Sequence, residues 1–336
     1  MSLVELSKSR WFNGYQKIFE HNSAQLKCRM RFGVYLPDNQ PESNLPVLFY
    51  LSGLKCTEEN FVVKSAMQRF ASNRKIIVVN PDTSPRGVVT GDGDDPSFGA
   101  AAGFYLDATE TKWAQNYRMY SYILDELVPL VFSTFSVEKN KCGIFGHSMG
   151  GHGKEGTRRH TQPWNNPPTN PWDTQPRHPN PLPDIMNPES TVLGVGIKMG
   201  HSLTQPKYFH NVFILPDFCA LTIALKHPEL FSSVSAFAPI CNPSKKGQKY
   251  LRVFLGNDEG KWANYDATEL AKKYEGPKRE VLIDQASDLL PANLLAVENP
   301  NLTWKYRLHP NYDHGYAFIQ TFIGDHFEHH ANCWAI

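Results

Sequence analysis

The sequence lacks an excess of either charge. Its 336 residues hold 34 lysines and arginines against 33 aspartates and glutamates, which gives a formal net charge of +1. Without such a bias, the charge does not indicate nucleic acid or a membrane surface as a partner. Apolar runs of the roughly 18 residues that a membrane-spanning helix needs are also missing, as is the apolar core of a signal peptide near the start. We therefore expect a soluble, cytoplasmic protein.

Closely spaced cysteines are missing as well. The six cysteines are dispersed and form no C-x-x-C pair. We expect reduced thiols, the usual state in the cytosol. His326, His329 and His330 lie at helical spacing and could bind a metal. A solvated end of an amphipathic helix is the interpretation that we prefer, so no metal site is expected.

The sequence does contain one G-x-S-x-G pattern, at residues 146–150, with Ser148 at its centre. An apolar run precedes the pattern and small residues surround the serine, as a strand requires in order to turn abruptly into a helix. The serine backbone in such a turn is strained, and larger side chains two positions away would collide across it. The pattern predicts a nucleophile elbow with the Ser148 hydroxyl at its tip.

Apolar patterns around this elbow predict a sheet with helices between its strands. Residues 25–36 alternate like a half-buried strand, which we expect to be an antiparallel edge strand, and residues 45–51 and 75–80 are continuously apolar, like strands buried on both faces. Further predicted elements are helices at 59–72, 117–132 and 220–228, and strands that begin at 233, 252, 281 and 303. This order predicts an α/β-hydrolase fold, a single domain over residues 1–336 with a mostly parallel central sheet and helices on both faces.

Residues 154–219 interrupt this order directly after the elbow. Eleven of the chain's 25 prolines fall within them, and no helical or strand period continues through them. Such a segment buries too little apolar surface to offset the entropy lost on ordering. We interpret it as an insertion without structure, derived from an unspliced intron or a mistaken gene model. A lid or partner loop is the alternative, although a lid would usually carry an amphipathic helix.

A catalytic triad can be placed on this predicted fold. Its members follow one another along the chain as serine, acid and histidine, and Ser148, Asp288 and His314 satisfy that order after three predicted strands. The serine needs a base to take its proton, and the imidazole needs a carboxylate to hold its tautomer. Two other aspartates compete for the role of the acid. We expect Asp284 to cap its strand, and Asp313, next to the histidine, to point the wrong way.

The oxyanion hole and the substrate pocket can be placed in the same way. In this fold the loop after strand 45–51 and the residue after the serine supply the backbone N–H donors. We therefore expect Leu54 and Met149 to bind the oxyanion. Cys56 follows Leu54 by two residues and is expected to line the substrate pocket, although an inert buried thiol fits its position equally well. His147 is expected to pack beside the serine, within the substrate pocket, and not to act as the base.

Seven segments resemble the S-formylglutathione hydrolase, or esterase D, family. They are LSGLKCT (51–57), PDTSPRG (81–87), GFYLDAT (103–109), YRMYSY (117–122), GHSMGGHG (146–153), SAFAPICNP (235–243) and YDH (312–314). Apart from residues 154–219, the resemblance covers nearly the whole chain. It implies hydrolysis of a small-molecule thioester, S-formylglutathione, to glutathione and formate in formaldehyde detoxification, with side activity on small carboxylic esters. It also implies a cytosolic enzyme without a metal or other cofactor, and a homodimer.

The chain departs from this family at three places. Residues 154–219 fall within the first turns of the helix that positions Ser148. The loop at Asp288 runs at once into Leu-Leu-Pro, where the family has a longer loop, and residues 244–248 lack the family's Cys-Pro-Trp. Two other hypotheses stay open: a general small-acyl carboxylesterase, and a non-catalytic isoform whose elbow helix is broken by the insertion.

Overall fold

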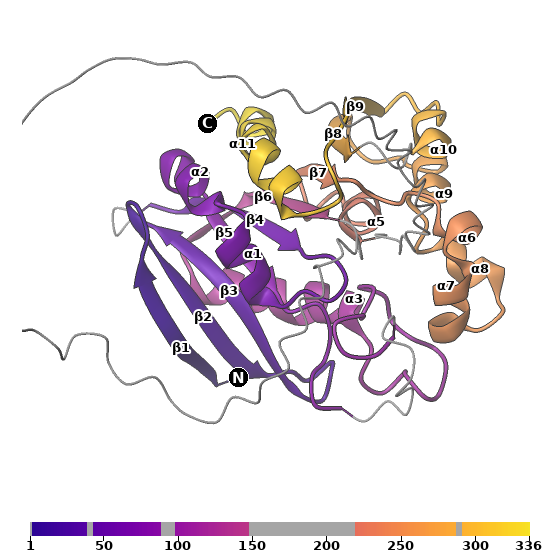
Figure 1. The fold of residues 1–336 in the computed structure, drawn as a ribbon, viewed down its shortest axis with the longest axis horizontal. Coiled ribbons are helices and arrows are strands. Elements are labelled where there is room, and N and C mark those ends of the chain that lie inside the picture. The colour runs from indigo at the N-terminus through magenta and orange to yellow at the C-terminus, as the bar shows by residue number, and fades with distance from the viewer. Residues whose placement is uncertain (1, 39–42, 89–97, 148–218, 287–290) are drawn as a thin grey trace, which may run out of the picture. The chain divides into compact units, whose positions relative to one another are not determined.

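A nine-stranded sheet forms the centre of the protein in the computed structural model, which describes residues 2–38, 43–88, 98–147, 219–286 and 291–336 (Figure 1). The strands lie in the order β1-β2-β3-β5-β4-β6-β7-β8-β9. Their bounds are β1 Leu3–Arg10, β2 Gly14–Asn22, β3 Arg29–Pro37, β4 Leu45–Leu51, β5 Ile77–Pro81, β6 Val137–His147, β7 Ser233–Phe237, β8 Arg279–Ala286 and β9 Leu302–His309. All of the described residues belong to one compact unit, which comprises Met1–Gly153 and Val212–Ile336.

The sheet is mostly parallel, as the sequence predicted. Each neighbouring pair from β5 and β4 through to β8 and β9 is parallel, whereas β1, β2, β3 and β5 pair antiparallel. The expectation that residues 25–36 form an edge strand is wrong, because β3 lies between β2 and β5 and the edge position belongs to β1. Nearly all side chains of β1 are exposed, so this strand carries no alternating apolar pattern that the sequence could reveal.

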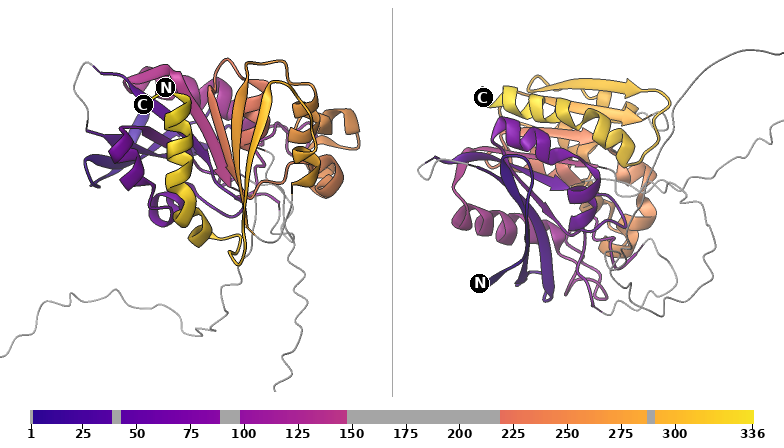
Figure 2. Two further views of the ribbon diagram at one scale, coloured as in Figure 1. Left: turned by 90° about the horizontal axis from the view of Figure 1, so that it is seen from above. Right: turned by 60° about the vertical axis from the view of Figure 1, so that its left-hand side comes forward.

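Helices pack against both faces of the sheet (Figure 2). Their bounds are α1 Glu58–Lys64, α2 Met67–Arg74, α3 Met119–Ser121, the π-helical segment η1 Tyr122–Leu127, α4 Val128–Thr134, α5 Cys219–Lys226, α6 Pro243–Lys246, α7 Gln248–Leu255, α8 Glu259–Ala263, α9 Ala267–Lys272, α10 Ala292–Leu295 and α11 Tyr316–Cys333. In β4, Phe49 belongs to the hydrophobic cluster formed with η1, α4 and α5, and its neighbour Tyr50 belongs to the cluster formed with α1, α2 and α11. Successive side chains of a strand point to opposite faces, so a continuously apolar strand serves both clusters.

Two predicted elements differ from those in the structure. The helix predicted at 59–72 is broken between α1 and α2, where the Ser65 hydroxyl donates to the Phe61 carbonyl at 2.6 Å and Ala66 has a φ of 57°. The strand predicted at 252–256 is wrong, because these residues fall on α7 and its C-cap. Leu251, Phe254 and the adjacent Leu255 are buried on one side of that helix, so the short apolar run has the period of a helix face.

The three histidines near the C-terminus are buried on α11, so the expectation of a solvated helix end is wrong. The rings of His326 and His330 lie 2.8 and 3.0 Å from the Ser235 hydroxyl on β7, and His329 Nε2 lies 3.0 Å from the Val234 carbonyl. Histidines three and four residues apart share one helix face, and here that face packs on the sheet. Within the described ranges, no group of three or more histidine, cysteine or acidic side chains could hold a metal ion. No helix in the same ranges is long and apolar enough to cross a membrane.

Acidification is expected to unfold this protein. Burial lowers the pKa of each of five histidines, namely His21, His147, His326, His329 and His330. The contribution of these neutral histidines to stability is therefore fully present above the unfolded-state pKa of about 6.5. It is lost as the pH falls below that value, because the unfolded chain then binds protons that the folded chain does not. Each such histidine lowers the free energy of unfolding by up to about 1.4 kcal/mol per pH unit. Urea denaturation at a series of pH values between about 8 and 5.5 measures the slope.

A variant that lacks one of these histidines tests whether they are the source of this slope. His330→Gln removes one titrating ring and should reduce the slope below about pH 6.5 by up to one proton's share. A wild-type free energy of unfolding that stays constant across the series would contradict the expectation.

Candidate active site

The candidate site lies at the edge of the sheet where the parallel strands end. Leu51 of β4 pairs with Gly146 of β6, and His147 of β6 pairs with Phe237 of β7. The last pair of β8 and β9 ends at His309. Because parallel strands bring their carboxyl ends to one edge, the chain segments that follow β4, β6, β8 and β9 all leave from it. Of the predicted site residues, Ser148, Met149 and Asp288 lie outside the described ranges. Leu54, Cys56, His147 and His314 lie within them.

His147 and His314 are brought together at this edge. His147 is the last residue of β6 and is buried, and its ring centroid lies 4.9 Å from that of His314. Burial, assisted by the nearby His314, lowers the pKa of His147 well below its ordinary range. Its imidazole therefore stays neutral at physiological pH, which suits a packing role better than a charged one. His314 is half-buried and lies between the end of β9 and the start of α11.

Residues 52–56, between β4 and the N-cap of α1, form the loop that contains Leu54, and we call it the Leu54 loop. Hydrogen bonds hold it on both of its sides. Lys55 N donates to the Ala101 carbonyl at 2.9 Å, and Cys56 N donates to the Gly53 carbonyl at 3.3 Å. The Cys56 carbonyl in turn accepts a hydrogen bond from the Thr83 hydroxyl at 2.7 Å. The N–H of Leu54 itself has no acceptor among the residues that the structure describes. A fixed N–H without an acceptor is the kind of donor that an oxyanion hole uses, because no hydrogen bond must break before it acts.

Helix α1 starts directly after this loop and anchors its far end. Thr57 is the N-cap: its hydroxyl accepts from Glu59 N at 3.2 Å, and the Asn60 side chain accepts from Thr57 N at 2.7 Å. This reciprocal pair is a capping box, which satisfies two backbone donors that the helix leaves without partners. The position of the loop is therefore set on one side by β4 and on the other by α1.

Cys56 lies beside Tyr316, which was not among the site residues predicted from the sequence. The Tyr316 hydroxyl lies 3.8 Å from Cys56 Sγ, and the Tyr316 ring centroid lies 6.2 Å from that of His147. Burial raises the pKa of the Cys56 thiol, so the sulfur is protonated and weakly nucleophilic at neutral pH. Tyr316 thus joins the Leu54 loop to the two histidines. Its only signal in the sequence is its place two residues after His314.

The two competing acids are held by other groups. The sequence led us to expect that Asp284 caps its strand. In the structure it lies within β8 instead. Its carboxylate accepts two hydrogen bonds of 2.6 Å from Arg307 on β9. Although burial raises the pKa of Asp284, its hydrogen bonds with His326 and Arg307 hold it below the usual range. Asp313 is exposed and accepts from Gly315 N at 2.9 Å, at the turn into α11.

Comparison with known proteins identifies close relatives. Residues 23–154 and 218–329 match the family model named Esterase. S-formylglutathione hydrolases of Bos taurus and Mus musculus are each 40% identical to this chain over 98% of both sequences, and that of Arabidopsis thaliana is 38% identical over 98% of this chain and 97% of its own.

The solved structures agree with this comparison. An S-formylglutathione hydrolase from Agrobacterium tumefaciens is 34% identical, with a TM-score of 0.73 and 98% of each chain covered. The serine hydrolase FphF of Staphylococcus aureus, 16% identical with a TM-score of 0.60 over 95% of this chain and 99% of its own, is similar in fold alone. The α/β-hydrolase fold predicted from the sequence is confirmed.

Proposed function

Because the chain belongs to the S-formylglutathione hydrolase family of esterases, we propose that it hydrolyses S-formylglutathione to glutathione and formate. The observation that carries this proposal is an identity of 40% with relatives of that name over 98% of both sequences. The site supports the proposal, since the N–H of Leu54, the half-buried His314 and the end of β6 lie at one edge of the sheet. A general carboxylesterase remains the second candidate.

The proposed reaction has two acyl-transfer steps. His314 takes the hydroxyl proton of Ser148, whose oxygen attacks the formyl carbon, while the N–H groups of Leu54 and Met149 bind the oxyanion. The C–S bond breaks, and His314 gives the proton to the departing glutathione thiolate. A water molecule, deprotonated by His314, then attacks the formyl ester. The bond between the formyl carbon and the Ser148 oxygen breaks, His314 returns the proton to that oxygen, and formate is released. Asp288 holds the tautomer of His314 throughout. Neither step requires a metal or other cofactor.

The family resemblance also suggests the setting of this activity. We propose a cytoplasmic enzyme that acts as a homodimer on a small thioester, with neither nucleic acid nor membrane as a partner. We further propose a single domain over residues 1–336 that is interrupted by the insertion at 154–219. The match to the Esterase family, which leaves residues 155–217 unmatched, supports this organisation.

Removal of the insertion tests both the activity and the organisation. We expect a chain with Gly153 joined directly to Ala220 to hydrolyse S-formylglutathione roughly 10²-fold faster than the full chain, because a small displacement of the residues around a nucleophile costs about that factor. Both purified proteins would be assayed on S-formylglutathione and on esters with longer acyl groups. Higher kcat/KM on the formyl thioester would support the proposed substrate, and higher kcat/KM on the longer esters would favour the carboxylesterase.

The other outcomes are equally informative. Equal rates for the two chains would show that the insertion is a tolerated surface loop. If neither folded chain hydrolysed S-formylglutathione, the proposed function would be wrong. Circular dichroism and a cooperative unfolding transition establish that each chain is folded.

A further inference from the structure

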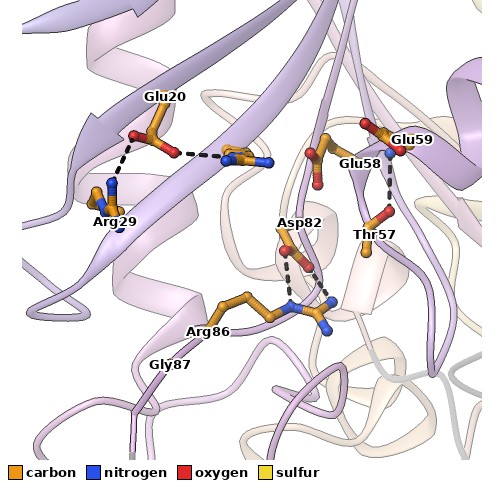
Figure 3. Close-up of a pocket in the computed structure, with 9 residues that line it drawn as sticks. Glu20, Arg29, Thr57, Glu58, Glu59, Asp82, Arg86 and Gly87 are labelled. Carbon is orange, nitrogen blue, oxygen red and sulfur yellow. Dashed lines mark hydrogen bonds and ion pairs between the residues drawn. The ribbon is translucent and has the colours of Figure 1, made fainter. Parts of the chain in front are cut away.

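A charged pocket of about 400 Å³ lies next to the Leu54 loop (Figure 3). Its walls come from β2, β3, the N-terminal end of α1 and the segment that follows β5. The Arg86 guanidinium connects the pocket to the loop, because it donates to the Cys56 carbonyl at 2.9 Å and to the Asp82 carboxylate at 2.5 and 2.9 Å. The lining of the pocket therefore begins at Thr57, three residues beyond the candidate oxyanion donor.

The interior of this pocket carries a carboxylate that forms no salt bridge with a described side chain. Glu58 is only 3% exposed, and its carboxylate accepts a hydrogen bond from its own backbone N–H and is attracted by the charge of Arg31. Figure 3 shows that it lies on the same side of the pocket as Asp82. Burial raises the pKa of Glu58, and the charge of Asp82 raises it further. A carboxylate has about four acceptor sites, so Glu58 retains acceptors that a ligand with a positive charge would use.

Arginines supply the opposite charge nearby. Arg31 pairs with Glu20 at 3.0 Å, yet half of its side chain remains exposed, and Arg86 is also partly exposed. A guanidinium has five donors, so each of these arginines retains donors for another carboxylate. Acceptors for an ammonium and donors for a carboxylate therefore line the same small space. That pairing matches the ammonium and carboxylate of an α-amino acid.

We propose that this pocket binds the α-amino-acid end of the γ-glutamyl arm of the thioester substrate. The ammonium lies between Glu58 and Asp82, and the α-carboxylate lies on Arg31 and Arg86. This assignment rests on the proposed function and deepens it. The glycine end of glutathione carries a carboxylate but no ammonium, so Glu58 selects the γ-glutamyl end.

The dimensions of the sheet suit this arrangement. Asp82 directly follows β5, which is two strands from β6, a separation of roughly 10 Å. The γ-glutamyl-cysteinyl arm between the sulfur and the α-carbon is about as long as three extended residues, again roughly 10 Å. A thioester at the end of β6 can therefore reach Asp82 with its γ-glutamyl end, and the Arg31 side chain, which starts one strand further away on β3, lines the same pocket.

Binding of a glutathione thioether to the full chain tests the proposal without relying on turnover. S-methylglutathione and S-methyl-N-acetylcysteinylglycine, which lacks the γ-glutamyl arm, would be titrated by calorimetry into the wild type, Glu58→Gln and Arg31→Gln. Glu58→Gln is expected to weaken S-methylglutathione binding roughly 10- to 100-fold, the usual range for a charged hydrogen bond. The shorter ligand should bind the wild type and Glu58→Gln equally weakly. Glu275→Gln, which removes an exposed carboxylate outside the pocket, is the matched control and should change nothing.

The outcomes separate this proposal from the proposed function. Equal affinity of the wild type for the two ligands, absence of S-methylglutathione binding, or unchanged binding by both pocket variants would overturn the pocket assignment. Arg31→Gln keeps the proposal testable if Glu58→Gln does not fold. If the pocket binds S-methylglutathione as expected but the protein does not hydrolyse S-formylglutathione, the proposed activity fails and the pocket assignment stands.

Discussion

Ser148→Ala is expected to lower kcat on S-formylglutathione by roughly 10⁶-fold, the loss typical of removing a triad nucleophile. No nearby described group is suited to replace it. Cys56 lies beside Tyr316 near the site, but the raised pKa of its thiol keeps the sulfur protonated. The neutral imidazole of His147 is buried. We expect only the slow residual rate that substrate binding and the oxyanion donors provide.

Two measurements check this expectation. Initial rates with S-formylglutathione give kcat, and covalent labelling with a fluorophosphonate shows whether a single activated serine is present. Ser133→Ala, which removes an exposed hydroxyl on α4, should keep both the rate and the labelling. A Ser148→Ala protein that still hydrolyses the thioester at a rate near that of the wild type would refute the assignment of the nucleophile.

The sequence predicted the strands whose burial is uniform and missed those whose burial depends on distant partners. Residues 45–51 form β4 as predicted, because a strand covered on both faces must be apolar throughout. In β2, by contrast, His21 is buried beside Tyr122, with His21 Nε2 3.0 Å from the hydroxyl. A polar residue on the inner face hides the alternating pattern, and its partner lies about a hundred positions away in the chain. No local pattern could therefore have revealed β2.

The same distinction holds at the candidate site. The order of strands and the G-x-S-x-G pattern were enough to propose Ser148, His314 and the Leu54 loop, because each follows the end of a strand. The contact between Tyr316 and Cys56 joins residues 260 positions apart, and the pocket around Glu58 combines four separate segments of the chain. Such groupings depend on the folded sheet, so no local pattern in the chain indicates them.

The role of Asp284 shows why the acid was difficult to assign from the sequence. Asp284 and Asp288 both lie at the end of one predicted strand, and either could be the acid on position alone. In the structure Asp284 is buried between Arg307 on β9 and His326 on α11. This network connects the strand that precedes Asp288 to the strand and helix on either side of His314. Asp284 therefore supports the structure around the proposed acid and base, and Asp288 remains our proposal for the acid.

Asp288→Asn is expected to lower kcat on S-formylglutathione by about 10⁴-fold with little change in the free energy of unfolding. An amide in place of the carboxylate no longer holds the reactive tautomer of His314 or stabilises its imidazolium, and about 10⁴ is the loss that this change produces in a serine triad. Asp284→Asn should behave in the opposite way. It leaves Arg307 without its buried partner, which costs about 3 kcal/mol of stability, while the folded fraction keeps most of its kcat.

Steady-state kinetics and urea denaturation of both variants, with Asp313→Asn as a third, measure these two effects separately. The Asp313 carboxylate is exposed and bonded to Gly315 N, so its replacement should affect kcat far less than that of Asp288. A folded Asp288→Asn protein with wild-type kcat would show that the acid lies elsewhere. A folded Asp284→Asn protein whose kcat has fallen by about 10⁴ would identify Asp284 as the acid, and the network with Arg307 would then be part of the triad. Because one measurement reports on the reaction and the other on folding, the pair distinguishes a carboxylate that orients the base from one that holds the sheet together.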